Sequence, residues 1–170
     1  MRILVVSDTH GRRERLRDVI TRQGAYDALL FLGDGIRDVD EGTAGLVAVR
    51  GNCDGVLFGA DLPQDRMLTL DGVKIFMTHG HAYSVKSGVE RLLAHAYALG
   101  ADIAVFGHTH EPLERYVPVG TPLPDGSLTE RAMYLFNPGS LGAPREGKPT
   151  FGNIEIRNGR ALLSHGEAER

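Results

Sequence analysis

Histidines, aspartates and an asparagine gather in five short stretches of the chain, each directly behind a run of apolar residues. The stretches read SDTHG from residue 7, GDG from residue 33, GNCD from residue 51, THGH from residue 78 and GHTH from residue 107. Imidazole, carboxylate and amide oxygen without a thiolate are typical ligands of borderline divalent metals such as Mn²⁺, Fe, Ni²⁺, Co²⁺ or Zn²⁺. The candidate ligands are Asp8, His10, Asp34, Asn52, His79, His108 and His110.

Seven candidate ligands are more than one tetrahedral ion can take, so they favour two five- or six-coordinate ions that share a bridge. A carboxylate can bridge two metals, and Asp34 is the lone candidate behind its apolar run, which makes it the natural bridge. Each stretch alone also has a plain structural interpretation; Asp8, for example, could cap a following helix. Five stretches of one kind are hard to explain without a shared site. His95 and His165 are expected to stay outside it.

We predict that the apolar run before each stretch is a short buried strand, because it is rich in branched apolar residues. In a parallel or mixed α/β sheet, the carboxyl ends of the strands collect along one edge, where ligands bind. Glycines beside each stretch allow the backbone to turn sharply there. Strand order is not readable from one sequence, so other placements stay open. The predicted strands are Arg2–Val6, Ala28–Leu32, Leu46–Val49, Val73–Met77 and Asp102–Phe106.

Two amphipathic helices are predicted between these strands. Residues 12–23 carry apolar side chains at helical spacing and are followed by Gly24. Ser84–Leu99 has one apolar face and is followed by Gly100, which is typical of a helix end. Residues 35–45 are predicted to form a loop or a short helix.

The remaining segments indicate strands joined by turns. Asp71-Gly72 and Asn158-Gly159 are typical of type I′ hairpins. The strands that they join are Met67–Leu70 with Val73–Met77, and Phe151–Ile156 with Arg160–Ser164. Ala132–Phe136 is a further predicted strand, residues 55–65 are a predicted loop, and residues 112–131 are a predicted excursion loop that could hold one hairpin.

Length and composition limit the class of protein. The 170 residues suit one domain, residues 1–170, with a sizeable core. The balance of 19 basic against 22 acidic residues gives a net charge of −3, so no overall basic surface for nucleic acid is expected. Arg12, Arg13, Arg15 and Arg17 form a local basic cluster, interpreted as a solvated helix face, with a phosphate-attracting rim as the alternative.

Cysteine content and hydropathy bear on the compartment. Cys53 is the only cysteine, which excludes an internal disulfide and suits a reducing compartment. The first apolar run breaks at Ser7 and Asp8, too early for a signal peptide. No run reaches the roughly 20 apolar residues of a membrane helix. We therefore expect a cytoplasmic protein without membrane contact.

The motifs together resemble the calcineurin-like metallophosphoesterase superfamily, whose order is D-x-H, G-D, G-N, H and G-H-x-H. The short chain, the GNCD stretch and NPGS at residues 137–140 resemble its small bacterial and archaeal phosphodiesterase branch. The resemblance implies an α/β fold of two facing mixed β-sheets flanked by helices, a four-layer sandwich. It also implies metal-dependent hydrolysis of phosphate esters.

The resemblance further implies how the ligands are divided. One metal would be held by Asp8, His10, Asp34 and His110, and the other by Asp34, Asn52, His79 and His108. The residues expected to act in catalysis are Asp34, Asn52 and His108, whereas Cys53, Asp54 and His81 are expected to support the ligands or contact substrate. Mn²⁺ is the first expectation for the two divalent ions, with Ni²⁺, Fe, Co²⁺ or Zn²⁺ as alternatives.

The chain departs from the superfamily pattern in two places. Many members carry histidine directly after the asparagine of the G-N motif, where this chain has Cys53. The proton for the leaving oxygen must then come from elsewhere; His81 is one candidate, although a satisfied structural histidine is the favoured interpretation. The segment 112–131 is also longer than the usual return to N-P-G-S. Cys53 is expected to be a partly buried neighbour of the site and not a nucleophile.

Charge favours hydrolysis of an anionic ester. Two divalent ions, two aspartates and a bridging hydroxide leave a centre with a net charge near +1, and metals bring the pKa of bound water to roughly 7. We therefore predict a metal-dependent phosphodiesterase that acts on a small-molecule ester. The alternative is a protein-interaction scaffold of this fold with little or no catalysis; a nuclease is disfavoured by size and charge. A homo-oligomer is compatible with the sequence.

Overall fold

The strands of this protein pair into two mixed sheets. The structure is a computed structural model that describes residues 1–55 and 59–169, and within them each sheet has five strands. The first sheet has the order β10-β9-β1-β2-β3, formed by Arg160–Glu167, Thr150–Arg157, Arg2–Val6, Ala28–Phe31 and Leu46–Ala48. The second has the order β4-β5-β6-β8-β7, formed by Asp65–Leu70, Val73–Thr78, Ile103–Val105, Met133–Pro138 and Pro112–Val117.

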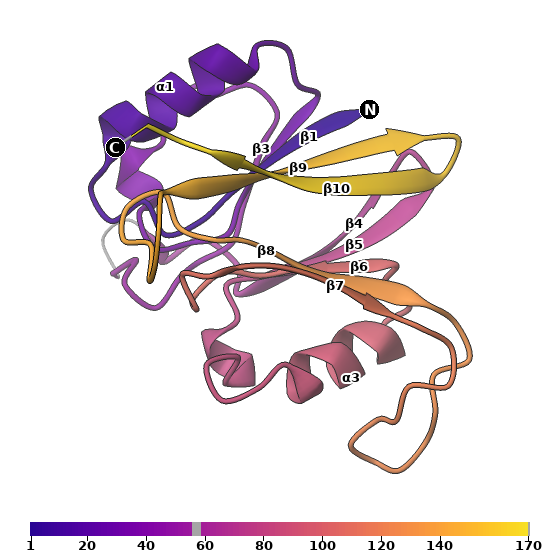
Figure 1. Ribbon diagram of the computed structural model, residues 1–170. Coiled ribbons are helices and arrows are strands. Elements are labelled where there is room, and N and C mark those ends of the chain that lie inside the picture. The colour runs from indigo at the N-terminus through magenta and orange to yellow at the C-terminus, as the bar shows by residue number, and fades with distance from the viewer. Residues whose placement is uncertain (56–58, 170) are drawn as a thin grey trace.

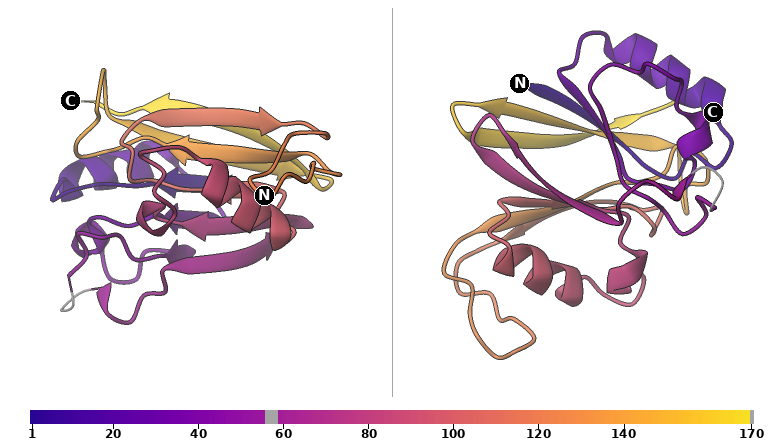
Figure 2. Two further views of the ribbon diagram at one scale, coloured as in Figure 1. Left: turned by 90° about the horizontal axis from the view of Figure 1, so that it is seen from below. Right: turned by 180° about the vertical axis from the view of Figure 1, so that it is seen from behind.

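The sheets face each other and each carries a helix on its outer side (Figure 1). Helix α1, Arg13–Gln23, covers the first sheet, and helix α3, Glu90–Ala98, covers the second. The two further views in Figure 2 show the same layering from below and from behind. This arrangement confirms the predicted α/β fold with two facing mixed sheets flanked by helices.

The core explains why the short strands are apolar on both faces. In β1, Ile3 and Val5 belong to the cluster between the sheets, whereas Leu4 and Val6 pack with α1. Strands that are buried on both sides read as continuous apolar runs and not as an alternation. The central strands are therefore held firmly, which fixes where their carboxyl ends lie.

Those carboxyl ends point to one edge of each sheet. Strands β1, β2 and β3 run parallel, and so do β5, β6 and β8. The predicted hairpins β4–β5 and β9–β10 are confirmed. Both central residues of each turn have the positive φ that a type I′ turn requires: 47° and 80° at Asp71-Gly72, and 53° and 70° at Asn158-Gly159.

The prediction of a helix over Ser84–Leu99 is wrong in its first part. Residues 81–83 form a single 3₁₀ turn, and α3 begins only at Glu90. Ser84 has a φ of 55° and Gly88 a φ of 150°, which a right-handed helix cannot accommodate. Val85 is nevertheless buried against the second sheet, so tertiary packing and not helical periodicity explains its apolar character.

The prediction of an excursion loop over residues 112–131 is also wrong in its first part. Residues 112–117 form β7, the edge strand that pairs with β8. Proline is tolerated at the first position of an edge strand because its missing N–H is not needed there. The rest forms a loop with one bridge between Pro122 and Leu128, and Figure 1 shows it at the far end of the sheets from the β3–β4 connection.

The other sequence predictions differ from the structure by small amounts. Residues 36–38 form a 3₁₀ turn within the predicted loop or short helix. The predicted loop at 55–65 includes residues 56–58, which lie outside the described residues. Among the described helices, none is long and apolar enough to cross a membrane.

Candidate metal centre

The loops that carry the five polar stretches meet at one edge of the molecule. The Asp8 N–H donates to the Gly33 carbonyl over 3.0 Å, which joins the ends of β1 and β2. The Gly107 N–H donates to the His79 carbonyl over 3.1 Å, which joins the ends of β5 and β6. Asp8 connects the two sheets, because its Oδ2 accepts the His108 N–H over 3.1 Å. Polar stretches far apart in sequence thus share one small region.

Asp8, His10 and His110 form one group, with a ligand atom from each within 4.8 Å of the others. Asp8 Oδ1 lies 3.0 Å from His110 Nε2 and 3.7 Å from His10 Nε2. The two Nε2 atoms are 3.3 Å apart. Asp8 is fully buried, and its Oδ1 has no hydrogen-bond partner among the described residues. A buried carboxylate oxygen of this kind requires a cation or a proton beside it.

Asp34, His79 and His108 form a second group on the same distance criterion of 4.8 Å. His79 Nε2 lies 3.4 Å from Asp34 Oδ2 and 3.1 Å from Asn52 Oδ1. Asp34 Oδ2 also lies 3.9 Å from His10 Nε2, so this carboxylate faces both groups. Each group contains three of the four residues that the resemblance implied for one metal, and the division of ligands stays a prediction.

Backbone carbonyls fix the orientation of two imidazoles. His79 Nδ1 is 2.7 Å from the Leu32 carbonyl oxygen, and His110 Nδ1 is 2.6 Å from the Ala143 carbonyl oxygen. A carbonyl only accepts, so Nδ1 carries the hydrogen, and in the neutral ring the Nε2 lone pair faces the carboxylates. Metal-binding histidines are commonly held by such a hydrogen bond. Lone pairs that face carboxylate oxygens fit a divalent cation between them.

The charges of the site depend on one another. Burial opposes ionisation of Asp8, but the adjacent His10 and His110 imidazoles hold the pKa of this carboxyl well below its usual range. Burial acts in the same direction on Asp34, and the His79 imidazole and the Cys53 N–H together lower the pKa of Asp34 to about 2. Both carboxylates are therefore negative at neutral pH, as metal ligands must be.

The imidazoles divide into two classes. Burial opposes protonation of His79, but Asp34 and Asp8 raise its pKa, and the adjacent Asp8 carboxylate raises the pKa of His110. Burial and the neighbouring His79 lower the pKa of His108 to about 4, so His108 is neutral at pH 7. The two aspartates thus favour positive charge at His79 and His110, which is the charge that a divalent ion would bring.

Backbone strain is concentrated at the site. Five of the seven predicted ligands have a positive φ: 54° at Asp8, 44° at His10, 60° at Asp34, 68° at His108 and 62° at His110. Residues other than glycine rarely adopt this conformation, which costs on the order of 1–3 kcal/mol in a sparsely populated region. The surrounding hydrogen bonds hold it in place, and strain of this kind is typical of functional sites.

Asp54 supports the loop of Asp34 from behind. Its Oδ2 accepts the N–H groups of Asp34 and Gly51 over 2.8 and 2.9 Å. Its Oδ1 accepts those of Gly35 and Ile36 over 2.7 and 3.0 Å. One buried carboxylate thus ties the loop after β2 to the loop after β3. These four hydrogen bonds favour a positioning role for Asp54.

The NPGS stretch supports the other loops. Asn137 Nδ2 donates to the Gly107 carbonyl over 2.9 Å. Ser140 Oγ donates to the Asp8 carbonyl over 2.8 Å and accepts the Ala143 N–H over the same distance. The segment therefore holds the backbone of the SDTHG and GHTH stretches. Ser140 also holds Ala143, whose carbonyl orients His110.

Cys53 and His81 lie beside the candidate ligands. Cys53 is exposed, so the expectation that it is partly buried is wrong; its Sγ lies within 4.8 Å of ligand atoms of His10 and Asp34. Desolvation and the Asp34 carboxylate raise the pKa of the thiol to about 11, which disfavours a thiolate nucleophile. His81 lies 5.4 Å from His79 between ring centroids, and its Nδ1 has no partner among the described residues, so the protein alone does not satisfy it.

Several supporting contacts have no signal in the sequence. The carbonyls of Leu32 and Ala143 orient imidazoles, yet any residue type could supply them. Ser7 Oγ donates to Asp8 Oδ2 over 2.5 Å, and the adjacent serine of the SDTHG stretch was the one available hint. As expected, His95 is exposed outside the site; His165 bonds to the Asn137 carbonyl from β10.

Comparison with known proteins identifies the class. The family model of the calcineurin-like phosphoesterase superfamily domain matches residues 1–159, and the chain belongs to this superfamily. The chain is 32% identical to a probable metallophosphoesterase of Bacillus subtilis, YsnB, over 85% of its own length and 78% of that protein. It is 30% identical to the Escherichia coli phosphodiesterase YfcE, over 91% of its length and 88% of that protein.

Solved structures show the same fold. A protein of Streptococcus pneumoniae TIGR4 described as a predicted phosphoesterase has a TM-score of 0.75 and 26% identity, over 98% of this chain and 88% of that one. Vps29 of Entamoeba histolytica has a TM-score of 0.69 and 20% identity, over 98% and 99% of the two chains. At that identity, the likeness to Vps29 concerns the fold alone.

Proposed function

We propose that this protein is a metal-dependent phosphodiesterase with a two-metal centre. The observation that carries the proposal is the pair of ligand groups around Asp34, in which buried carboxylates face imidazole nitrogens and Asp8 Oδ1 has no hydrogen-bond partner among the described residues. The names of the relatives YfcE and YsnB support the same reaction class. We propose Asp8, His10, Asp34 and His110 for one metal, and Asp34, Asn52, His79 and His108 for the other.

Bound divalent ions would supply Lewis acidity to the phosphate and lower the pKa of a water molecule. The chain supplies two carboxylates that stay ionised and two imidazoles, of His79 and His110, whose Nδ1 atoms are fixed by carbonyls. His108, neutral at pH 7, could hold a metal without losing a proton first. Two divalent ions against two carboxylates leave positive charge, which favours an anionic ester.

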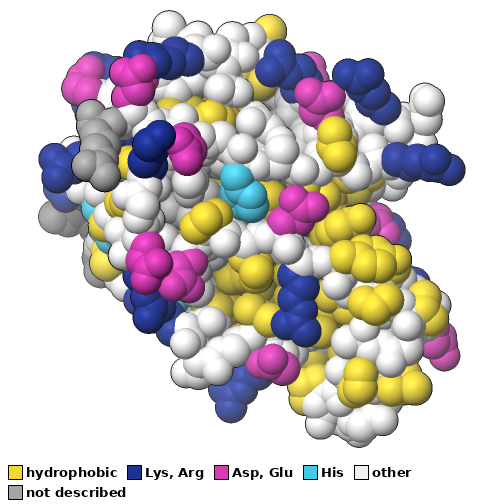
Figure 3. Space-filling view, in the orientation of Figure 1, with side chains coloured by type: hydrophobic (Ala, Val, Ile, Leu, Met, Phe, Trp, Pro, Cys, Tyr) yellow, Lys and Arg dark blue, Asp and Glu magenta, His cyan; other side chains and the backbone are white. Residues whose placement is uncertain are grey.

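The leaving group receives little help from the protein. Cys53 stands where a histidine could protonate it, and the raised pKa of this thiol makes it a poor acid. We therefore propose small-molecule phosphodiesters with good leaving groups, such as aryl esters, as the best substrates. Over the face in Figure 3, acidic and basic side chains are interspersed, which gives no broad basic surface there for nucleic acid. Mn²⁺ is the first metal to test; the cytoplasmic location and a homo-oligomer stay predictions.

The direct test compares wild type with Asp34→Asn after the metal has been removed and Mn²⁺ added back. We expect wild type to hydrolyse bis-p-nitrophenyl phosphate and the variant to fall to the rate of chelated protein, with less bound metal in elemental analysis. Asp125→Asn, in the distant exposed loop, is the control and should behave as wild type. An Asp34→Asn protein that keeps full activity would remove this residue from the proposed bridge.

A further inference from the structure

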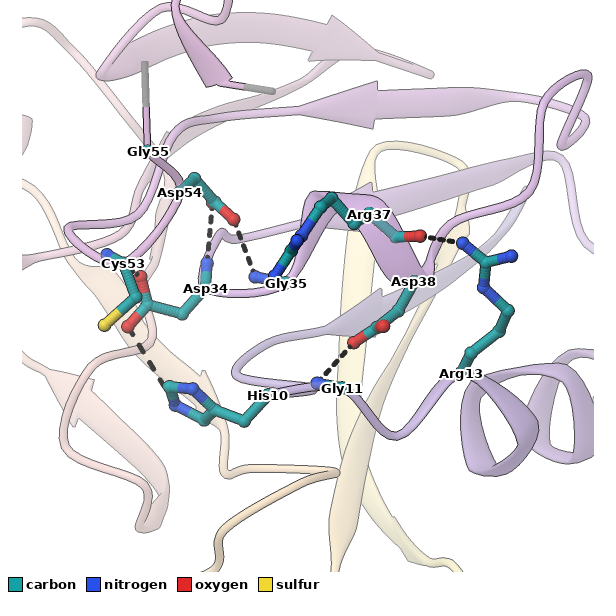
Figure 4. A pocket seen from close by; sticks show the side chains of 10 residues that line it. All are labelled: His10, Gly11, Arg13, Asp34, Gly35, Arg37, Asp38, Cys53, Asp54 and Gly55. Carbon is teal, nitrogen blue, oxygen red and sulfur yellow. Dashed lines mark hydrogen bonds and ion pairs between the residues drawn. The ribbon is translucent and has the colours of Figure 1, made fainter. Parts of the chain in front are cut away.

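A cleft of about 830 Å³ opens beside the candidate metal centre. His10, Asp34 and Cys53 line one end of it, and its lining continues to Arg13 at the start of α1. Figure 4 shows the Cys53 sulfur beside the Asp34 carboxylate, at the end of the cleft where His10 also lies. The proposed ligand sets use His10 and Asp34 but leave this sulfur out.

Cys53, His10 and Asp34 form a third group of possible metal ligands, with one ligand atom of each within 4.8 Å of the others. This is the distance criterion that also defines the two groups described above. The third group shares His10 with the first of them and Asp34 with the second. A cation held by this group would therefore occupy the same centre with a sulfur ligand added.

Hydrogen bonds hold the sulfur at this place. The Cys53 N–H donates to Asp34 Oδ1 over 2.7 Å, and Asn52 Nδ2 donates to Cys53 Sγ over 3.2 Å. Cys53 is nevertheless exposed, so an ion in solution can reach it. The thiol is thus both positioned and accessible, as a metal ligand must be.

A second observation indicates a cation at the same place. Asp8 Oδ1 is fully buried, has no hydrogen-bond partner among the described residues and lies 3.7 Å from His10 Nε2. Burial and the Asp34 carboxylate raise the pKa of the Cys53 thiol to about 11, and Asp8 acts in the same direction. The same carboxylates attract a divalent ion, and an ion that coordinates a thiol displaces its proton. The raised pKa therefore belongs to the metal-free protein and does not prevent coordination.

Thiolate is a soft ligand that suits ions such as Zn²⁺, whereas Mn²⁺ favours carboxylate and water ligands. We propose that Zn²⁺ and Cd²⁺ bind at this centre with Cys53 as a ligand beside His10 and Asp34, whereas Mn²⁺ binds there without the sulfur. When the sulfur–metal bond forms, the S–H bond breaks and its proton passes to solvent. This inference rests on the proposed function, because it concerns the metal selectivity of the same centre.

A sulfur ligand should make the enzyme sensitive to such ions. A thiolate adds one negative charge, which removes part of the positive charge that would favour an anionic ester. When Zn²⁺ replaces Mn²⁺, wild type should therefore lose a larger share of its kcat/KM on bis-p-nitrophenyl phosphate than Cys53→Ser loses of its own. An equal or smaller loss in wild type would contradict a sulfur ligand in the working enzyme.

Absorption spectroscopy tests the ligand directly, because Cys53 is the only cysteine of the chain. Metal-free wild type titrated with Cd²⁺ should gain the ultraviolet charge-transfer absorption of a sulfur–cadmium bond, whereas Mn²⁺ should produce none. Cys53→Ser keeps the size of the side chain and should lose this absorption. Its preference for Cd²⁺ over Mn²⁺ in competition titrations should fall at least roughly tenfold, because even residues that only support a ligand change metal affinity by roughly 10–100-fold.

Two histidine variants show whether the sulfur belongs to the centre. In His10→Gln, the sulfur–cadmium absorption should weaken at the same Cd²⁺ concentration, because the ion loses a shared ligand. His95→Gln, at an exposed histidine outside the site, is the control and should keep the wild-type titration. Binding of Cd²⁺ without the absorption, an unchanged metal preference in Cys53→Ser, or an absorption that His10→Gln leaves unaltered would overturn the assignment.

The same titration separates this inference from the proposed function. Hydrolysis that depends on Mn²⁺, without a sulfur–cadmium absorption, would reject Cys53 as a ligand and keep the phosphodiesterase. The absorption, without hydrolysis of any ester by the Mn²⁺-loaded protein, would reject the phosphodiesterase and keep Cys53 as a ligand.

Discussion

Asp54 shows how a residue that is not itself a proposed metal ligand can position one of the ligands, Asp34. Its two oxygens accept four N–H groups, from Asp34, Gly35, Ile36 and Gly51. An asparagine side chain has the same shape, but its NH₂ group would face one of the two pairs of backbone N–H groups. Those N–H groups would then lose their acceptor. Buried donors that lose an acceptor destabilise a protein, and displaced supporting residues weaken a metal site.

We predict that Asp54→Asn lowers the free energy of unfolding by about 1–3 kcal/mol and weakens Mn²⁺ binding roughly 10–100-fold. Urea denaturation and metal titration measure the two effects. Asp61→Asn, an exposed carboxylate on the same connection, should change neither. Unaltered metal affinity in Asp54→Asn would show that these hydrogen bonds do not position Asp34.

His108 gives a pH prediction for the metal-free protein. Its ordinary pKa is 6.5, and burial with the neighbouring His79 lowers the folded value to about 4. Between these values the unfolded chain binds more protons at this residue than the folded one, so acid favours unfolding. Stability from neutral His108 is thus present above pH 6.5 and is lost as the pH falls toward about 4.

The measurement compares urea midpoints of wild type and His108→Gln in chelator across that pH range. Wild type should lose stability relative to the variant as the pH falls, because glutamine does not titrate. Parallel curves for the two proteins would show that His108 keeps its ordinary pKa. The other histidines are common to both proteins, so their first-order contributions cancel in the difference.

At the scale of elements, the site depends on loops that approach one another closely. A Cβ on Gly51 would collide with Asp34 Oδ1 and with the Asp34 backbone nitrogen. A Cβ on Gly107 would collide with the Ser7 hydroxyl in the same way. Glycine at these positions therefore serves contact between the ends of different strands, and not only the turn in its own loop.

We predict that Gly51→Ala separates the loops after β2 and β3, lowers stability by about 1–3 kcal/mol and reduces metal binding. Gly55→Ala is the matched control on the same connection, because a Cβ there meets no atom of the described residues within 4 Å. Thermal denaturation with and without Mn²⁺ reports both effects. Equal behaviour of the two alanine variants would contradict close packing at Gly51.

At the scale of the whole molecule, the candidate metal centre joins the two sheets. The carboxylate of Asp8, which follows β1 of the first sheet, accepts a hydrogen bond from the backbone N–H of His108, which follows β6 of the second. His10 faces His110 across the same junction. Unfolding either sheet would separate ligands that a metal holds together. Metal binding should therefore stabilise the chain as a single cooperative unit.

We predict that Mn²⁺ at roughly 100 times its dissociation constant stabilises wild type by about 2.7 kcal/mol, seen as a higher midpoint in thermal denaturation. Chelator should reverse the shift. Asp8→Asn removes a buried charge from the junction and should show little shift at the same Mn²⁺ concentration. A shift of wild-type size in this variant would mean that the metal binds elsewhere.

The sequence by itself determined the central strands and the chemical types at their ends. Continuous apolar runs predict strands buried on both faces, and Asp-Gly and Asn-Gly turns fix hairpins locally. These features depend on neighbours in the chain, which explains why β1, β2, β5 and the two hairpins were predicted well. The residue types of the five polar stretches, and their resemblance to one superfamily, likewise came from the sequence.

The sequence could not supply the limits of elements that tertiary packing sets. Val85 is apolar because the second sheet covers it, and its spacing from the next apolar residues happens to match a helix. The positive φ angles of Ser84 and Gly88 exclude a helix there. The segment 112–117 became a strand because β8 offered an edge on which to pair. The periodicity of a short segment does not indicate which distant segment will pack or pair with it.

Only the tertiary structure decided how the ligands are oriented and what surrounds them. The carbonyls of Leu32 and Ala143, the four bonds of Asp54, and the cleft that joins Asp34 to Arg13 and Arg37 all link segments distant in sequence. Backbone atoms are the same in every residue, and directions in space depend on how two sheets pack. The residue types therefore indicated the kind of chemistry, whereas the packing of the sheets set the geometry of the ligands and the space left for a substrate.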